Sequence, residues 1–138
     1  MVGIVLISHG GMADGMMTSA PMLYPDFCQC VSLTLWPEDN PDEFQSKLEA
    51  KVREVDTGGG VFILADLLGG TPCNRSMYLL GDKVRVLSGL SMPMLVTLLS
   101  AREDTDDLDE ITSETLEMAK VGTVDVNELM KQRGLNNK

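Results

Sequence analysis

The sequence predicts a single α/β domain, residues 1–138, built on an open and mainly parallel sheet of four or five strands with helices on both faces. Two short runs, Gly3 to Ile7 and Val61 to Ala65, are entirely apolar or nearly so. Strands with such continuous runs are buried on both faces, as in a parallel sheet that helices cover. Segments with helical periodicity lie between the strand candidates, which is the order of βαβ units. The hydrophobic fraction of 43% suits one compact core.

Two further segments are predicted to be strands in less buried positions. Residues 28–35 alternate between apolar and polar side chains more than the first two runs do. Residues 83–87 include Lys83 and Arg85, so this strand is expected nearer an edge of the sheet. Edge strands tolerate such polar positions because part of their surface meets water.

The helices of the first half are marked by their starts and their apolar stripes. Asn40, Pro41 and Glu43 supply an N-cap, a proline at the first helical position and an acidic residue in the first turn. The residues that follow repeat at helical spacing and form one apolar stripe: Phe44, Leu48, Val52 and Val55. The first crossover, residues 13–24, contains Pro21, which is expected to kink or shorten a helix there.

Three more helices are predicted in the second half. Thr71 is expected to cap one that leads into residues 77–80. Residues 91–100 form the next, and an apolar stripe from Leu108 to Ala119 predicts a third that ends near Gly122. The last 16 residues are ambiguous between a short strand at 123–126 and a helix through Met130.

This order of elements favours a flavodoxin-like sheet with strand order 2-1-3-4. The first and third strands are then neighbours, and the crevice beyond their carboxyl ends is the switch point where such folds bind ligands. The first strand runs directly into His9, the single histidine of the chain, and the third runs directly into Asp66. We therefore expect these two side chains to lie side by side in the crevice.

This pair suits a histidine that carries a phosphoryl group. One imidazole nitrogen attacks phosphorus while the other keeps the proton, and a carboxylate that accepts this N–H fixes the tautomer and the ring orientation. Glycines near both strand ends let backbone N–H groups approach phosphoryl oxygens, and a threonine at a helix start adds a hydroxyl donor. The predicted catalytic residues are His9 and Asp66. The predicted phosphoryl-binding residues are Gly10, Gly11, Gly69, Gly70 and Thr71.

Composition and motifs disfavour several other classes of function. A formal net charge of −10 disfavours binding to nucleic acid or to an anionic membrane surface. The three cysteines lack zinc-ligand spacing, the acidic run at residues 103–110 is not an EF-hand, and no nucleotide-binding pattern occurs. We therefore expect no metal and no cofactor. No run approaches the roughly 20 apolar residues that a membrane span needs, so a cytoplasmic protein with reduced cysteines is expected.

Three segments carry a family resemblance. Ile7-Ser-His-Gly10 follows the first strand, Asp66-Leu-Leu-Gly-Gly-Thr-Pro-Cys-Asn74 follows the third, and Ser91-Met-Pro-Met-Leu95 follows the fourth. In this order and spacing, over about residues 1–120, the chain resembles the mannose-type (mannose, fructose and sorbose) enzyme IIA components of bacterial sugar phosphotransferase systems.

The resemblance implies a phosphotransferase component with a phosphohistidine intermediate. His9 would accept the phosphoryl group on Nε2 from the histidine phosphocarrier protein and donate it to the IIB component, here expected as a separate protein. Membrane contact would be indirect, through the IIC and IID subunits that import the sugar. Asp66 would hold the imidazole, and Thr71 would match the family's hydroxyl residue near the phosphoryl group. The resemblance also implies a homodimer in which C-terminal elements are exchanged.

Two positions depart from the family pattern. Gly11 and Leu68 stand where the family often has tryptophan. Both positions line the expected docking surface, to which we also assign Met12 and Asn74, so partner specificity is the property that they would change. Trp36, at the end of the second strand, is expected either to be half-buried structure or to lie beside the crevice.

Two alternatives stay open. One is a phosphotransfer subunit of dihydroxyacetone kinase, which has a similar histidine and fold, and the other is a non-enzymatic α/β binding module. The Gly-Gly-Thr-Pro-x-Asn segment favours the sugar-transport branch over the first alternative. Histidine phosphatases and tetrapyrrole chelatases also place His-Gly after a first strand, but their chemistry needs further histidines, and this chain has one.

Overall fold

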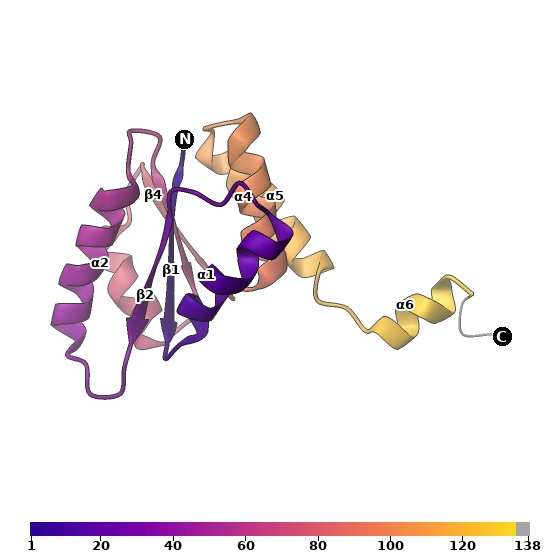
Figure 1. Cartoon of the computed structure of the whole chain (residues 1–138), viewed down its shortest axis with the longest axis horizontal. Helices are drawn as coiled ribbons and strands as arrows, with labels where there is room; N and C mark the ends of the chain where they lie inside the picture. The colour runs from indigo at the N-terminus through magenta and orange to yellow at the C-terminus, as the bar shows by residue number, and fades with distance from the viewer. Residues whose placement is uncertain (135–138) are drawn as a thin grey trace.

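The computed structural model describes residues 1–134, and its centre is a parallel sheet with helices on both faces (Figure 1). The strands are β1 (Gly3–His9), β2 (Cys30–Leu35), β3 (Val61–Ala65) and β4 (Val84–Ser88). They lie in the order β2-β1-β3-β4, which confirms the predicted topology. β1 and β3 pair at the centre of the sheet. β4, which contains Arg85 and directly follows Lys83, is an edge strand as predicted.

Helices connect the strands at the positions that the sequence predicts. They are α1 (Met12–Leu23), α2 (Pro41–Val55), α3 (Thr71–Ser76), α4 (Met92–Asp104), α5 (Leu108–Val121) and α6 (Val126–Gln132), with a 3-10 turn η1 (Met77–Leu79) after α3. The Asn40 side chain caps α2 by accepting hydrogen bonds from the N–H groups of Asp42 and Glu43. The cap predicted at Thr71 is wrong by one residue, because extended backbone at Gly70 makes that glycine the N-cap of α3. Pro21 lies in the last turn of α1, which ends two residues later.

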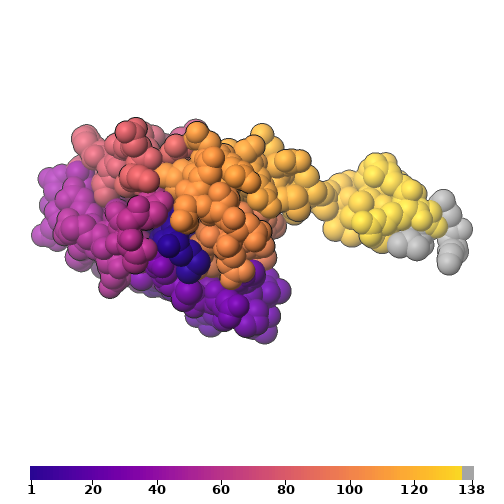
Figure 2. Space-filling model, turned by 90° about the horizontal axis from the view of Figure 1, so that it is seen from above, coloured from indigo at the N-terminus to yellow at the C-terminus, as the bar shows by residue number. Residues whose placement is uncertain are grey.

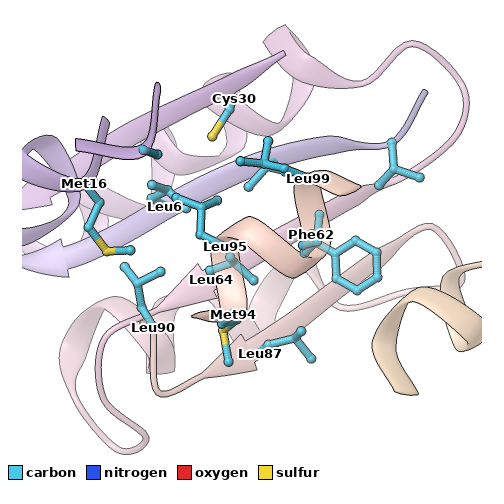
Figure 3. Packing of buried hydrophobic residues seen from close by; sticks show 14 of the residues in the cluster. Leu6, Met16, Cys30, Phe62, Leu64, Leu87, Leu90, Met94, Leu95 and Leu99 are labelled. Atoms are coloured by element: carbon cyan, nitrogen blue, oxygen red, sulfur yellow. The ribbon is translucent and has the colours of Figure 1, made fainter. Parts of the chain in front are cut away.

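The sheet separates two apolar cores, because successive residues of β1 and β3 point to opposite faces. On one face Leu6, Phe62 and Leu64 pack with buried side chains of α4 such as Leu95 and Leu99 (Figure 3). On the other face the cluster combines strand residues with the predicted stripe of α2: Val5, Ile7, Ile63, Ala65, Phe44, Leu48, Val52 and Val55. The two central strands are thus fixed in register by burial on both sides.

A buried arginine braces the end of the sheet opposite the carboxyl ends of the strands. Arg102 of α4 is 3% exposed. Its guanidinium donates hydrogen bonds to the carbonyl oxygens of Val2 (2.9 Å), Gln29 (3.3 Å) and Cys28. Burial lowers the pKa of Arg102 below its usual value. The side chain therefore ties α4 to the start of β1 and to the loop before β2.

The C-terminal segment forms a helix that stands apart from the body of the domain (Figures 1 and 2). α6 contains no buried residue. Of the two structures considered for the tail, the helix is present in the described part, and residues 135–138 lie outside the described residues. No helix among residues 1–134 is both long and apolar enough to cross a bilayer.

Candidate active site

His9 and Asp66 meet at the carboxyl ends of β1 and β3. The His9 Nδ1 atom lies 2.8 Å from Asp66 Oδ2, and the His9 backbone N–H donates to the same oxygen at 2.9 Å. The Asp66 side chain is 12% exposed, whereas that of His9 is 49% exposed. Because the carboxylate occupies Nδ1, the ring is left with Nε2 as its available nitrogen.

Asp66 holds the histidine with one oxygen. Its Oδ1 atom is buried and has no hydrogen-bond partner among residues 1–134. A largely buried carboxylate with one unpaired oxygen is strongly stabilised by any positive charge that develops on a neighbouring group. The imidazole, which becomes cationic when it binds a substituent at Nε2 and keeps its Nδ1 proton, is that neighbour.

The turn after His9 is fixed by Ser8 and Leu35. Ser8 is fully buried, and its hydroxyl donates to the carbonyl oxygen of Gly10 (3.0 Å) and accepts from the N–H of Ala13 (2.8 Å). The Gly10 N–H donates to the Leu35 carbonyl oxygen at 2.9 Å, and Gly10 adopts a positive φ of 58° that glycine tolerates. The loop between β1 and α1 is therefore held by hydrogen bonds to both β1 and β2.

Gly70 lies against the imidazole ring. A Cβ atom added at this residue would lie 2.6 Å from Cε1 and 3.3 Å from Nε2 of His9. Its φ of −79° is ordinary for any residue, so the requirement for glycine comes from the ring and not from the backbone. Gly69, in contrast, has open space around it and a φ of 87°, so glycine is favoured there by conformation.

The structure divides the predicted phosphoryl-binding residues into two groups. The N–H groups of Gly10 and Gly70 already donate to the carbonyl oxygens of Leu35 and Leu67, so these two glycines provide conformation and space instead of donors. For Gly11, Gly69 and the Thr71 hydroxyl, no hydrogen-bond acceptor is found within residues 1–134. Thr71 lines the same groove as His9.

A groove of about 530 Å³ opens beside His9. Its lining comes from the end of β1, the end of β2 and the starts of α2 and α3: His9, Gly10, Leu35, Trp36, Pro37, Asp39, Pro41 and Thr71. Trp36 is 48% exposed, and of the two positions considered for it the structure shows the one beside the crevice. His9 continues the alternation of Val5 and Ile7, so its side chain emerges on the face of the sheet that α2 covers.

The three residues assigned to a docking surface have different environments. Leu68 and Met12 are 69% and 44% exposed, so apolar surface is available on either side of the histidine loop. Asn74 is exposed, but its side-chain N–H donates to the Gly69 carbonyl oxygen at 3.2 Å. Asn74 therefore braces the glycine loop in addition to facing solvent.

Sequence reasoning did not anticipate the bracing role of Ser8 or the contact between Gly70 and the ring. A serine within the otherwise apolar run of β1 was the available signal for the first. Within residues 1–134 there is no group of three or more histidine, cysteine, aspartate or glutamate side chains that could hold a metal ion.

Comparisons with known proteins agree on one family. A family described as "PTS system fructose IIA component" matches residues 3–116. The mannose-specific EIIAB component of Escherichia coli K12 is 31% identical to this chain over 123 residues. The match covers 88% of this chain and 38% of the length of the E. coli protein.

Solved structures agree with this result. The phosphotransferase system component EIIA from Streptococcus agalactiae superposes with a TM-score of 0.84 at 26% identity, covering 93% of this chain and 99% of that one. The IIA protein associated with the fucose utilization operon of Streptococcus pneumoniae gives 0.81 at 31% identity, covering 93% and 95%. The chain belongs to the mannose- and fructose-type IIA components of the sugar phosphotransferase system.

Proposed function

We propose that His9 carries a phosphoryl group on Nε2, which it accepts from the histidine phosphocarrier protein and passes to a IIB component. The sugar is then phosphorylated as the IIC and IID membrane subunits import it, and the IIA component acts in the cytoplasm. The observation that carries this proposal is the 2.8 Å contact of Nδ1 with Asp66, which leaves Nε2 as the available nitrogen of a half-exposed ring.

In the first step, the Nε2 lone pair attacks the phosphorus atom of the donor's phosphohistidine. The new N–P bond forms as the donor's N–P bond breaks, and the donor imidazole leaves with the electron pair. Nδ1 of His9 keeps its proton, so the ring becomes cationic, and Asp66 stabilises this charge through the hydrogen bond already present. Transfer to IIB is the same step in the opposite sense, with His9 as the leaving group.

Among the predicted residues, the phosphoryl oxygens would be bound by groups without another acceptor, which include the N–H groups of Gly11 and Gly69 and the hydroxyl of Thr71. These donors are neutral. A neutral set binds an anion less strongly than arginine or lysine would, which suits a protein that must pass the group on.

Incubation with phosphoenolpyruvate, enzyme I and the histidine phosphocarrier protein, followed by intact mass measurement, tests the proposal. We expect one added phosphoryl group that is lost in acid and retained in base, and its absence in His9→Ala. The Tyr78→Ala variant, which changes an exposed aromatic residue in η1, is the control and should be labelled like the wild type. Labelling that persists in His9→Ala would rule out this histidine as the carrier.

We also propose that the protein is a homodimer in which the C-terminal segment of each chain packs on the other. The separation of α6 from the body and the exposure of Val121, Val124 and Val126 support this, because a helix without buried residues gains its packing from a partner. Sedimentation of the full chain and of a variant ending at residue 122 measures the difference, and a monomeric full chain would refute it.

A further inference from the structure

We infer that Trp36 and the groove beside it form an anchoring site for a basic surface of the partner proteins. The groove would hold an apolar side chain of the partner next to His9. This inference rests on the proposed phosphoryl transfer and adds the chemistry by which the partner is held. The groove is lined by Leu35, Trp36, Pro37 and Pro41 as well as by His9 itself.

Strand register places the tryptophan next to the reacting histidine. Leu35 of β2 is the register partner of His9 of β1, and its carbonyl oxygen accepts the N–H of Gly10. Trp36 is the next residue along the chain. A protein that brings its own histidine to Nε2 of His9 must therefore cover the tryptophan.

The loop that presents Trp36 is already held in one conformation. The Trp36 N–H donates to Asp39 Oδ2 at 2.8 Å, and the Asp39 N–H donates back to the Trp36 carbonyl oxygen at 3.0 Å. Pro37 lies inside this closed turn, and Asn40 next to it caps α2. A half-exposed tryptophan on a rigid loop is a typical anchor residue, since little conformational entropy is lost when it is covered.

The charges around the groove indicate the character of the occupant. Residues 36–43 contain Glu38, Asp39, Asp42 and Glu43 and no basic residue. Of the acidic groups, Asp42 is already paired with Arg75, and Asp39 accepts the Trp36 N–H. Glu38 lies in the chain between the lining residues Pro37 and Asp39, is exposed, and has no ion-pair partner within residues 1–134. Glu43 is also exposed and unpaired there, but it lies with Lys47 outside the groove lining. An apolar floor with an acidic edge complements an apolar side chain flanked by lysine or arginine.

A free sugar stacked on Trp36 is the alternative occupant, and the acidic edge does not favour it. Sugars are neutral and are recognised through many hydrogen bonds, whereas half of the groove lining consists of Leu35, Trp36 and two prolines. We therefore assign the groove to a protein and treat sugar binding as an outcome that the experiment can detect.

Trp36→Ala tests the inference when two phosphoryl donors are compared. With the phosphorylated histidine phosphocarrier protein as donor, we expect the KM for that protein to rise about tenfold with kcat within twofold of wild type, as for loss of an interface anchor. With phosphoramidate, a small donor that needs no docking surface, the labelling rate should stay within twofold. Tyr78→Ala, an exposed aromatic residue outside the groove, is the matched control and should leave the KM unchanged.

Two further measurements distinguish a protein from a sugar as the occupant and test the contribution of the acidic side chains. Trp36 is the only tryptophan of the chain, so its fluorescence should change when unphosphorylated carrier protein is added and stay constant with mannose. The double variant Glu38→Gln, Glu43→Gln should raise the KM about threefold and weaken its dependence on ionic strength.

An unchanged KM in Trp36→Ala, or fluorescence that responds to the sugar and not to the protein, would overturn the inference. If the wild type is labelled by neither donor, the phosphohistidine function itself fails. Those two failures are therefore distinguishable.

Discussion

Replacing Gly70 by alanine should separate ring orientation from every other property of the site. The added Cβ would lie 2.6 Å from His9 Cε1, whereas carbon atoms in contact stay about 3.5 Å apart. The ring must therefore retreat by about 0.9 Å. The Nδ1–Oδ2 distance of 2.8 Å has little room for such a movement, because hydrogen bonds weaken steeply beyond about 3.2 Å.

The expected loss follows from the bond at risk. A hydrogen bond to a charged group contributes about 1.5–3 kcal/mol, and each 1.4 kcal/mol or so is a factor of ten in rate. We therefore expect transfer to His9 to slow by about 10- to 100-fold in Gly70→Ala. Gly70 accordingly acts by positioning the ring.

Gly11→Ala is the matched control. Both glycines are helix N-caps with ordinary φ values, −80° for Gly11 and −79° for Gly70, but a Cβ at Gly11 would meet nothing within 4 Å. Each variant should lose a similar amount of helix capping, about 0.5–1 kcal/mol, because alanine is a poorer N-cap than glycine. Labelling with phosphoramidate gives the rate, and ¹⁵N NMR of the single imidazole reports the tautomer. Equal labelling rates in the two variants, with the wild-type imidazole spectrum in Gly70→Ala, would refute the steric argument.

Three further variants or treatments have defined outcomes. Asp66→Asn should slow phosphoryl transfer at least about 100-fold, with an unchanged melting temperature, because the cationic ring loses its counter-charge; a rate within threefold of wild type would remove the carboxylate from the mechanism. Arg102→Met should lower the free energy of unfolding by about 3 kcal/mol in urea titrations, since three carbonyl oxygens lose their donor; a loss below about 1 kcal/mol would contradict the bracing role. Iodoacetamide at pH 8 should modify Cys28 alone in the native protein, because burial raises the pKa of Cys30 to about 12 and both Cys30 and Cys73 are buried, while denatured protein should take three groups. Two or more groups on native protein, measured by intact mass, would show that the buried thiols open to solvent.

The topology was predictable because the sequence encodes it at several levels that agree. The apolar runs of β1 and β3 have no polar face, which is typical of central parallel strands. The cap and stripe of α2 coincide with its observed bounds. The start of α3 was misplaced because threonine is a good cap, whereas the chain turns at Gly70. α6 was ambiguous because its segment is short and buries nothing in its own chain, so no packing pattern distinguishes helix from strand.

The site was predictable as far as topology determines it. His9 ends β1 and Asp66 follows its neighbour β3, so their proximity needs no knowledge of side-chain geometry. The bracing hydroxyl of Ser8 and the contact between Gly70 and the ring depend on how two turns close, which no spacing rule encodes. Trp36 had no distinguishing sequence pattern, because tryptophan is seldom fully buried and its residue type alone does not place it.

The chemistry of the site depends on strand register, and the two cores determine that register. Ile7 pairs with Ala65, and the next residue after Ala65 carries the carboxylate that reaches His9. A slip of β3 by one residue would move Asp66 by about 3.3 Å along the strand and turn its side chain to the other face. The same slip would move Ile63 and its neighbours out of the core that they fill and turn them toward the opposite core. Because both cores are already packed, this rearrangement would cost buried apolar contacts. Apolar residues that never touch the phosphoryl group thus hold the carboxylate within hydrogen-bonding distance of the imidazole.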